Sequence, residues 1–259
     1  MIILTGFLAS LLAGLATGLG ALPLLGGGRP SDRQENAFLG FAAGVMLAAS
    51  FFSLIIPGIA HAESTGFSKT SAAAMVIAAM LIGSLFIGQL NRMAPSLDRL
   101  GLGPAEGIDD RHNRRIWLFV AAITLHNLPE GLAVGVSFGT GDMKAGTATA
   151  LGIGLQNIPE GLAVGAALIS IGLSRGRAVL WALGTGLVEP VAGLIGVATV
   201  AAVSGLLPWA LGFAAGAMIY VVAAEIIPHT HRTEPKTGEA TAGLMVGLAL
   251  MMFLDVVLG

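Results

Sequence analysis

Residues 125–135 read Leu-His-Asn-Leu-Pro-Glu-Gly-Leu-Ala-Val-Gly, and residues 155–165 repeat them as Leu-Gln-Asn-Ile-Pro-Glu-Gly-Leu-Ala-Val-Gly. Nine of the eleven positions are identical, which chance does not produce even in a chain rich in Gly and Ala. Each copy sets polar and charged side chains, among them Glu130 and Glu160, into an otherwise apolar run. The composition of the whole chain indicates what surrounds these runs.

The chain has 259 residues, of which 55% are hydrophobic and 11% are charged, and its mean hydropathy is +0.85. A soluble domain carries roughly a quarter charged residues, and a disordered chain is far less hydrophobic. The absence of Cys excludes disulfides, thiolate zinc sites and iron–sulfur clusters. A net charge of −2 gives no reason to expect a nucleic-acid partner. We therefore predict an all-α polytopic membrane protein whose surroundings are the lipid bilayer.

A bilayer core about 30 Å thick requires about 20 mostly apolar helical residues for each crossing. Eight stretches meet this requirement, and no period-two alternation suggests a barrel. We expect one transmembrane domain over residues 1–259, with a charged linker at about 92–113. The predicted helices lie at about 2–25, 36–60, 70–91, 114–138, 145–171, 177–204, 207–228 and 240–258.

Positive charge in the loops predicts the orientation, because cytoplasmic loops are enriched in Lys and Arg. Alternate loops lie on the same side of the membrane, and one of the two sets of loops contains only Lys69 and Lys144 as basic residues. We therefore expect both termini outside and the 92–113 loop in the cytoplasm. The basic residues of the cytoplasmic side are Arg29, Arg33, Arg92, Arg99, Arg111, Arg114, Arg115, Arg175, Arg177, Arg232 and Lys236.

Two weaker repeats extend the pattern. Residues 40–46 (GFAAGVM) recur as 212–218 (GFAAGAM), and residues 15–19 (LATGL) resemble 183–187 (LGTGL). The paired helices are separated by an odd number of crossings, so they run in opposite directions through the membrane. Such inverted repeats are typical of alternating-access transporters, whose substrate sites lie near the repeat interface.

Five carboxylates fall within the predicted spans. A carboxylate at the bilayer centre costs at least about 2.5 kcal/mol, so such residues are normally functional. Three of them lie at comparable depth with no Lys or Arg beside them, which predicts a divalent metal as their partner. Two others lie near helix ends, where the side chains also reach the interface. The central three are Glu130, Glu160 and Glu189, and the outer two are Glu225 and Asp255.

Helical spacing places the further candidate ligands beside these carboxylates. His126 precedes Glu130 by four residues and so shares one helix face with it, and Gln156 has the same relation to Glu160. An Asn follows each of them, Asn127 and Asn157. Imidazole, carboxylate and amide ligands suit Zn²⁺, Cd²⁺, Fe²⁺ and Mn²⁺ better than Cu(I).

The motifs His126–Gly131, Gln156–Gly161 and Glu189–Pro190 resemble the ZIP family of divalent-metal transporters, and within it the bacterial GufA-like branch. The resemblance covers essentially the whole chain. It implies eight helices in a 3+2+3 inverted arrangement and a bacterial inner-membrane location. It also implies metal uptake into the cytoplasm through a binuclear centre, with an elevator-like shift of one helix bundle against the other.

Carried over residue by residue, the resemblance implies two metal sites. The first comprises His126, Glu130, Gln156 and Glu160, with Met46 as an occasional soft ligand. The second comprises Asn127, Asn157 and Glu189, bridged to the first by the carboxylates Glu130 and Glu160. Some relatives have Asp at the position of Asn157, so the second site carries one negative charge fewer here.

The resemblance also implies residues along the pathway. Ser53 and Asp255 would line the outer entrance, and Glu225, His229 and His231 the cytoplasmic exit. Ser53 and Glu225 each follow a repeat methionine by seven residues (Met46 and Met218), which fits opposite ends of one pathway.

Several alternatives stay open. An efflux carrier would use the same centre, and a proton- or cation-coupled secondary transporter would use the carboxylates as a relay. An intramembrane metallohydrolase is a remote alternative, because its His-Glu-x-x-His signature is absent. Gly-rich helix faces allow packing within the chain or in a homodimer.

Overall fold

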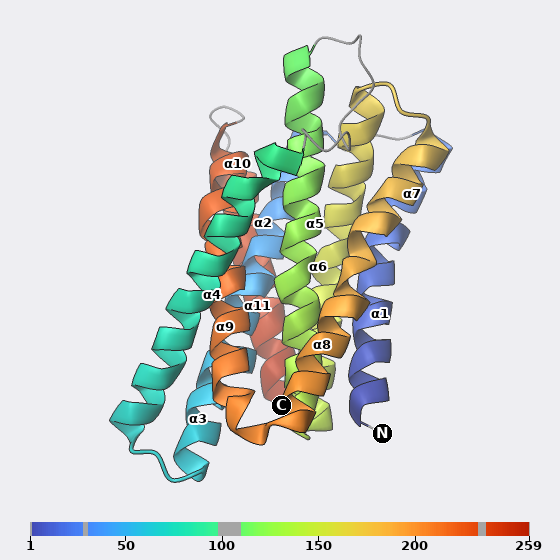
Figure 1. Cartoon of the computed structure of the whole chain (residues 1–259). Coiled ribbons are helices and arrows are strands. Elements are labelled where there is room, and N and C mark those ends of the chain that lie inside the picture. The colour runs from blue at the N-terminus through green and yellow to red at the C-terminus, as the bar shows by residue number, and fades with distance from the viewer. Residues whose placement is uncertain (1, 28–30, 98–109, 233–236, 259) are drawn as a thin grey trace.

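The computed structural model describes residues 2–27, 31–97, 110–232 and 237–258, and these residues form helices with no strand (Figure 1). Four segments depart from α-helical geometry: η2 and η5 are π-helical, and η1 and η4 are short 3₁₀ turns. In chain order the elements are α1 (Ile2–Ala21), η1 (Leu22–Gly26), α2 (Asp32–Ala48), η2 (Ala49–Ile55), α3 (Ile56–Ser64), α4 (Lys69–Leu97), α5 (Asp110–Gly139), α6 (Met143–Ser170), α7 (Arg175–Gly186), α8 (Val188–Ala202), η4 (Ser204–Leu206), α9 (Leu207–Val221), η5 (Val222–Ile226), α10 (Ile227–Arg232) and α11 (Thr237–Leu258).

Each of the eight predicted stretches coincides with helix, but the bounds differ. The predicted linker at 92–113 is shorter, because α4 continues to Leu97 and α5 begins at Asp110. An apolar run predicts only the part of a helix that lies in lipid. Backbone hydrogen bonding can extend the helix beyond the apolar residues. The rest of the predicted linker, 98–109, is outside the described residues.

Seven segments of the described chain are long and apolar enough to cross a membrane, and the chain is a multi-pass membrane protein. Among long helices, α6 is missing from this set although it has 28 residues. Gln156, Asn157 and Glu160 near its middle lower its mean hydropathy. The seven segments are Ile2–Gly26, Asn36–Ser64, Lys69–Leu90, Phe119–Gly139, Arg175–Ala202, Leu207–Ala224 and Gly238–Val257.

The packing of the helices follows the sequence repeats. Helix α2 packs on α11 and on α6, and its repeat partner α9 packs on α4 and on α5. Likewise α1 packs on α6, while α8 packs on α5. Figure 1 shows the N-terminus of α1 at the same end of the bundle as the loop that joins α5 to α6. Because α2 and α9 are repeat partners, the helices that they pack on, α11 and α4, also correspond to each other. The sequence comparison does not reveal this correspondence.

Two of these helices contain π-helical segments at corresponding places. In η2 the amide of Ile56 donates to the carbonyl of Phe51, and in η5 the amide of Ile227 donates to that of Val222. A proline follows each segment, Pro57 and Pro228, and each lacks the amide that a regular α-helix needs at that position. The wider π turn accommodates the proline, and such turns are frequent at functional sites.

Candidate metal centre

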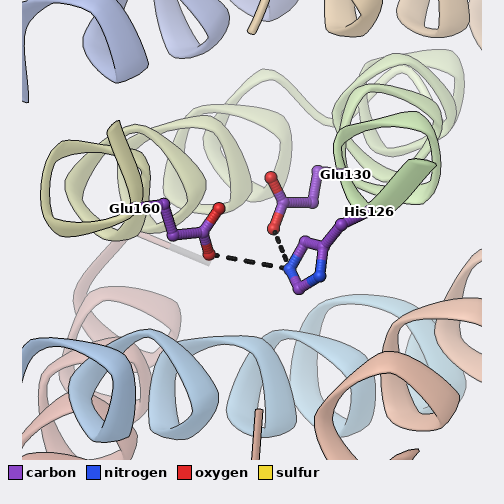
Figure 2. Close-up of side chains that lie close together, drawn as sticks. All are labelled: His126, Glu130 and Glu160. Carbon is purple, nitrogen blue, oxygen red and sulfur yellow. Dashed lines mark ion pairs between the residues drawn. The ribbon is translucent and has the colours of Figure 1, made fainter. Parts of the chain in front are cut away.

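Three side chains converge at the contact between α5 and α6. His126 and Glu130 on α5 and Glu160 on α6 are all buried, and one ligand atom from each lies within 4.8 Å of the others. The imidazole Nε2 of His126 lies 3.2 Å from Oε1 of Glu130 and 3.6 Å from Oε1 of Glu160. Figure 2 shows the three side chains pointing toward one another from the two helices.

Helix geometry and the repeat together bring these three groups to one place. The four-residue spacing sets His126 and Glu130 on one face of α5. Glu160 occupies the position of Glu130 in the second copy, on the neighbouring helix α6. Gln156, which takes the place of His126 in that copy, donates a hydrogen bond from Nε2 to Oε1 of Glu130. The cluster therefore joins four of the predicted ligands.

Most polar atoms of this cluster have no hydrogen-bond partner among the described residues. They include both ring nitrogens of His126, both carboxylate oxygens of Glu160, Oε2 of Glu130 and Oε1 of Gln156. Buried polar atoms in proteins are almost always paired, and leaving one unpaired costs about 1–3 kcal/mol. Nitrogen and oxygen donors of this kind are the ligands that divalent transition metals take. The cluster thus has the chemistry of a metal-binding site.

A second pair of side chains lies beside the first group. Nδ2 of Asn157 on α6 donates to Oε1 of Glu189 on α8 at 2.7 Å, and to the backbone carbonyl of Ala13 on α1 at 2.9 Å. Oδ1 of Asn157 and Oε2 of Glu189 are buried without a hydrogen-bond partner in the described part of the chain. Two of the residues predicted for the second site are therefore in direct contact.

Glu189 lies just after a break in a membrane-length segment. The helix predicted at 177–204 corresponds to the segment Arg175–Ala202, which is interrupted at Leu187 because α7 ends at Gly186 and α8 begins at Val188. Pro190 lacks the amide that would donate to the carbonyl of Gly186 in a continuous helix. The break puts Glu189 in the first turn of α8, where the helix dipole favours negative charge.

Two further predicted ligands are buried but not joined to these groups. Asn127 and Met46 are both 0% exposed. Neither amide atom of Asn127 has a hydrogen-bond partner, and among the described interactions neither residue contacts the cluster through its side chain. Their assignment as ligands stays a prediction.

The pathway residues are placed only in part. Ser53 in η2 donates from its hydroxyl to Oδ1 of Asp255 on α11 at 2.8 Å, so the two predicted entrance residues are in contact. The side chains of Glu225, His229 and His231 are outside the described part of the structure.

Sequence reasoning missed other polar groups in this region. The Ala13 carbonyl contacts Asn157, and no side-chain pattern indicates a backbone acceptor. The hydroxyls of Thr17 and Ser137 are buried and have no hydrogen-bond partner among the residues that the structure describes. Both residues lie inside predicted spans, and this position could have identified them from the sequence as buried polar groups.

Comparison with known proteins decides the family. The model of the family described as ZIP Zinc transporter matches residues 105–255. The zinc transporter GufA of Myxococcus xanthus is 46% identical over 254 residues, which cover 98% of this chain and 99% of the relative. The zinc transporter ZIPB of Bordetella bronchiseptica is 49% identical over 245 residues, covering 94% and 78%. The chain belongs to the ZIP zinc transporter family.

The human zinc transporter ZIP11 is more distant, at 35% identity over 307 residues, covering 88% of this ZIP chain and 89% of the relative. The family consists of membrane transporters, so the metallohydrolase alternative is excluded. The matched region contains both copies of the repeated motif and Glu189. The unpaired donor cluster of this ZIP chain therefore lies within the part that defines the family.

Proposed function

We propose that this chain carries Zn²⁺, and with it Cd²⁺, Fe²⁺ or Mn²⁺, across the membrane into the cytoplasm through a binuclear centre on α5 and α6. The observation that carries the proposal is the buried cluster of His126, Glu130, Gln156 and Glu160, whose ligand atoms have no hydrogen-bond partner outside the cluster among the described residues. The names of the relatives, all zinc transporters, support zinc as the principal substrate.

The distances within the first site suit zinc. Ligands bound tetrahedrally at about 2.1 Å from Zn²⁺ are about 3.4 Å from one another. The separations of His126 Nε2 from Glu130 Oε1 and Glu160 Oε1, 3.2 and 3.6 Å, lie on either side of that value. The two carboxylates neutralise the ion, and the Gln156 carbonyl oxygen and the Met46 thioether complete the site. These ligands release metal more readily than thiolates, as a carrier requires.

The second site comprises Asn127, Asn157 and Glu189, bridged to the first by Glu130 and Glu160. With an amide at residue 157 it has one negative charge fewer than a site with Asp there. We assign it an auxiliary role, in which it lowers the charge repulsion among the three carboxylates while the first site is loaded.

For the membrane arrangement we propose eight crossings in a 3+2+3 inverted repeat, with α6 as the additional crossing. Its polar residues face neighbouring helices: Gln156, Asn157 and Glu160 are at most 1% exposed, while Leu151 and Ile158 are exposed. A helix that buries its polar face inside a bundle can cross a bilayer despite a modest mean hydropathy. The distribution of Lys and Arg supports termini on the outer side.

Glycine contacts support alternating access by two bodies that slide. The first body contains α1, α5, α6, α7 and α8, and the second contains α2, α3, α4, α9, α10 and α11. Inside the first body a Cβ added to Gly131 would overlap the Glu189 carbonyl, and one added to Gly161 would overlap that of Thr17. Such backbone-to-backbone contacts hold helices together closely.

The second body is joined in the same manner. A Cβ added to Gly44 on α2 would overlap the Leu244 carbonyl of α11, and one added to Gly216 on α9 would overlap the Met80 carbonyl of α4.

Contacts between the two bodies are different. Among the described glycines, Gly152 on α6 is the one that faces the other body, and there it meets the side chains of Met251 and Val45. Flexible side chains permit movement that interlocked backbones prevent, so these contacts suit an elevator-like displacement. His126, Glu130 and Glu160 all belong to the first body and would move with it.

Uptake of metal into proteoliposomes tests the proposal. Purified wild type is compared with Glu130→Ala and Glu160→Ala, with Zn²⁺ and Cd²⁺ offered separately. Glu63→Ala, which removes an exposed carboxylate, is the matched control. We expect uptake by wild type and control, and background signal from the other two variants after normal membrane insertion. Normal uptake by either would disprove the site, and tight binding without transport by wild type would disprove the carrier function.

Loading metal on one side at a time separates uptake from efflux. A proton- or alkali-coupled carrier that does not bind transition metal would instead contain no stoichiometric zinc after purification in zinc-containing buffer.

A further inference from the structure

A groove of about 390 Å³ lies between α1 and α6, separate from the metal centre. Small residues form its floor, among them Ala9, Ala13 and Ala16 on α1 and Gly154 on α6. A Cβ built on Gly154 would meet only the Cα of Ala13, at 3.8 Å, so the two helices leave open space there. Exposed leucines of both helices, such as Leu12 and Leu151, flank the groove.

The groove is apolar along its length. Thr147 is the polar side chain in its lining, and its hydroxyl already donates to the Met143 carbonyl within α6. On α6 the lining extends from Thr147 to Ile158, which are eleven positions apart and so about 16 Å at 1.5 Å per residue. One leaflet of a bilayer core about 30 Å thick has nearly the same depth. The groove therefore matches the length of an acyl chain in a single leaflet.

A cation lies in line with the groove at its outer end. Lys144 precedes Thr147 by three residues and Leu151 by seven, so it continues the same helical stripe. Its side chain is exposed and makes no ion pair with the described residues. The neighbouring Asp142 is engaged in capping α6, since its carboxylate accepts from the amides of Lys144 and Ala145. An ammonium group at the level of the headgroups attracts anionic lipid.

We infer that this groove binds one acyl chain of an anionic phospholipid whose phosphate lies on Lys144. The inference depends on the membrane location of the chain and not on the direction or mechanism of transport. The half of the acyl chain farther from the phosphate packs against Ala13, whose backbone carbonyl accepts a hydrogen bond from Asn157. The lipid would thereby shield from the membrane side the helix contact that holds Asn157.

Native mass spectrometry of the purified full-length chain tests the inference. Dioleoyl phosphatidylglycerol and dioleoyl phosphatidylcholine, which share acyl chains and differ in headgroup charge, are added at equal concentrations. We expect wild type to retain one phosphatidylglycerol in preference to phosphatidylcholine. Retention of neither lipid, or of both equally, would overturn the inference.

Filling the groove tests the position of the acyl chain. Gly154→Leu places a side chain in the open space, and we expect at least a tenfold loss of phosphatidylglycerol retention. Gly184→Leu is the matched control, because a Cβ there meets nothing within 4 Å and the residue is exposed. Thr147→Trp, at an exposed position, blocks the outer end without disturbing the floor and covers the case in which Gly154→Leu misfolds. Unchanged retention in both variants, or loss of a dimer in place of lipid, would contradict lipid occupancy.

Removing the cation tests the position of the headgroup. Lys144→Gln should lower the preference for phosphatidylglycerol over phosphatidylcholine about fivefold, the effect of one Lys at a membrane surface. Lys69→Gln changes an exposed lysine at the start of α4 and should leave the preference unchanged. An equal loss in both variants would mean that Lys144 acts through net charge alone.

Discussion

Single residues in this chain show what burial does to the polar groups of the proposed metal centre. Glu160 is 1% exposed, and within the described structure neither of its carboxylate oxygens has a hydrogen-bond partner. A carboxylate in such surroundings is stabilised by a cation more than by any neutral neighbour. The proposed binding of metal at Glu160 therefore opposes the stability of the metal-free protein.

Replacing Glu160 by Met should separate these two effects. The substitution keeps a similar volume and removes two unpaired oxygens. We therefore expect the unfolding free energy of the metal-free protein to rise by about 1–3 kcal/mol, and its melting midpoint to rise with it. Added Zn²⁺, which raises the melting midpoint of wild type, should no longer do so. Thermal unfolding in detergent measures both. The exposed Glu63→Met change serves as control, and a lower midpoint for the metal-free Glu160→Met protein would contradict the reasoning.

Asn157 is the residue at which the second site is most open to test. Asn157→Asp loses the hydrogen bonds to Glu189 and to the Ala13 carbonyl, and it places a second carboxylate beside that of Glu189. We expect a less stable metal-free protein and a larger rise of the melting midpoint with Zn²⁺ than in wild type. Gln34→Glu adds the same charge at an exposed position. If Zn²⁺ stabilises both proteins equally, Asn157 does not contact metal.

At the scale of elements, glycines determine how closely the helices approach. On α2, Gly40 and Gly44 face carbonyls of α11, and on α11 Gly243 and Gly247 face backbone of α2 in return. A reciprocal contact of this kind tolerates no side chain on either helix. It explains why the apolar repeat at 40–46 and 212–218 retains its glycines in both copies.

A single methyl group should show the difference between a packed and an open glycine. In Gly44→Ala the new Cβ would overlap the Leu244 carbonyl, whereas in Gly184→Ala it meets nothing within 4 Å. We expect the first variant to lose about 1–3 kcal/mol of stability or more, and the second to keep or slightly exceed wild-type stability. Melting midpoints in detergent provide the comparison, and equal midpoints would refute the close approach.

For the whole molecule, the division into two bodies predicts where a cross-link blocks function. The chain contains no Cys, so engineered pairs have no competing thiols. A disulfide between Gly152→Cys on α6 and Met251→Cys on α11 would join the two bodies, because the added Cβ meets the Met251 side chain. We expect oxidation to stop metal uptake and reduction to restore it.

A pair within one body supplies the control. A Cβ added at Gly6 would lie 3.2 Å from Cβ of Val197, slightly less than the usual Cβ–Cβ distance across a disulfide. Gly6→Cys with Val197→Cys should therefore oxidise without loss of uptake. Uptake that survives a complete cross-link between the bodies would rule out their relative movement.

Much of this fold was predictable from local pattern. Eight apolar runs of membrane length were predicted, and each coincides with helix in the described residues, seven of the segments being long and apolar enough to cross a membrane. The pattern is informative because lipid requires each crossing to satisfy its own backbone hydrogen bonds. The four-residue spacing placed His126 and Glu130 on one helix face, and the repeat placed Glu160 at the matching position of the next helix. The contact of Ser53 with Asp255, by contrast, joins residues 202 positions apart, and the family resemblance implied only that both line the same entrance.

The sequence by itself determined the membrane location, the helices and the identity of the buried polar groups, since hydropathy and helical spacing are local properties of a chain. Only the tertiary structure decided which of those groups meet: the Ala13 carbonyl with Asn157, Gln156 with Glu130, and α1 against α6 with a groove between them. The break before Glu189 also became visible only there. These features depend on contacts between helices distant in the chain, and no local pattern of residues specifies the distance at which two backbones come to rest.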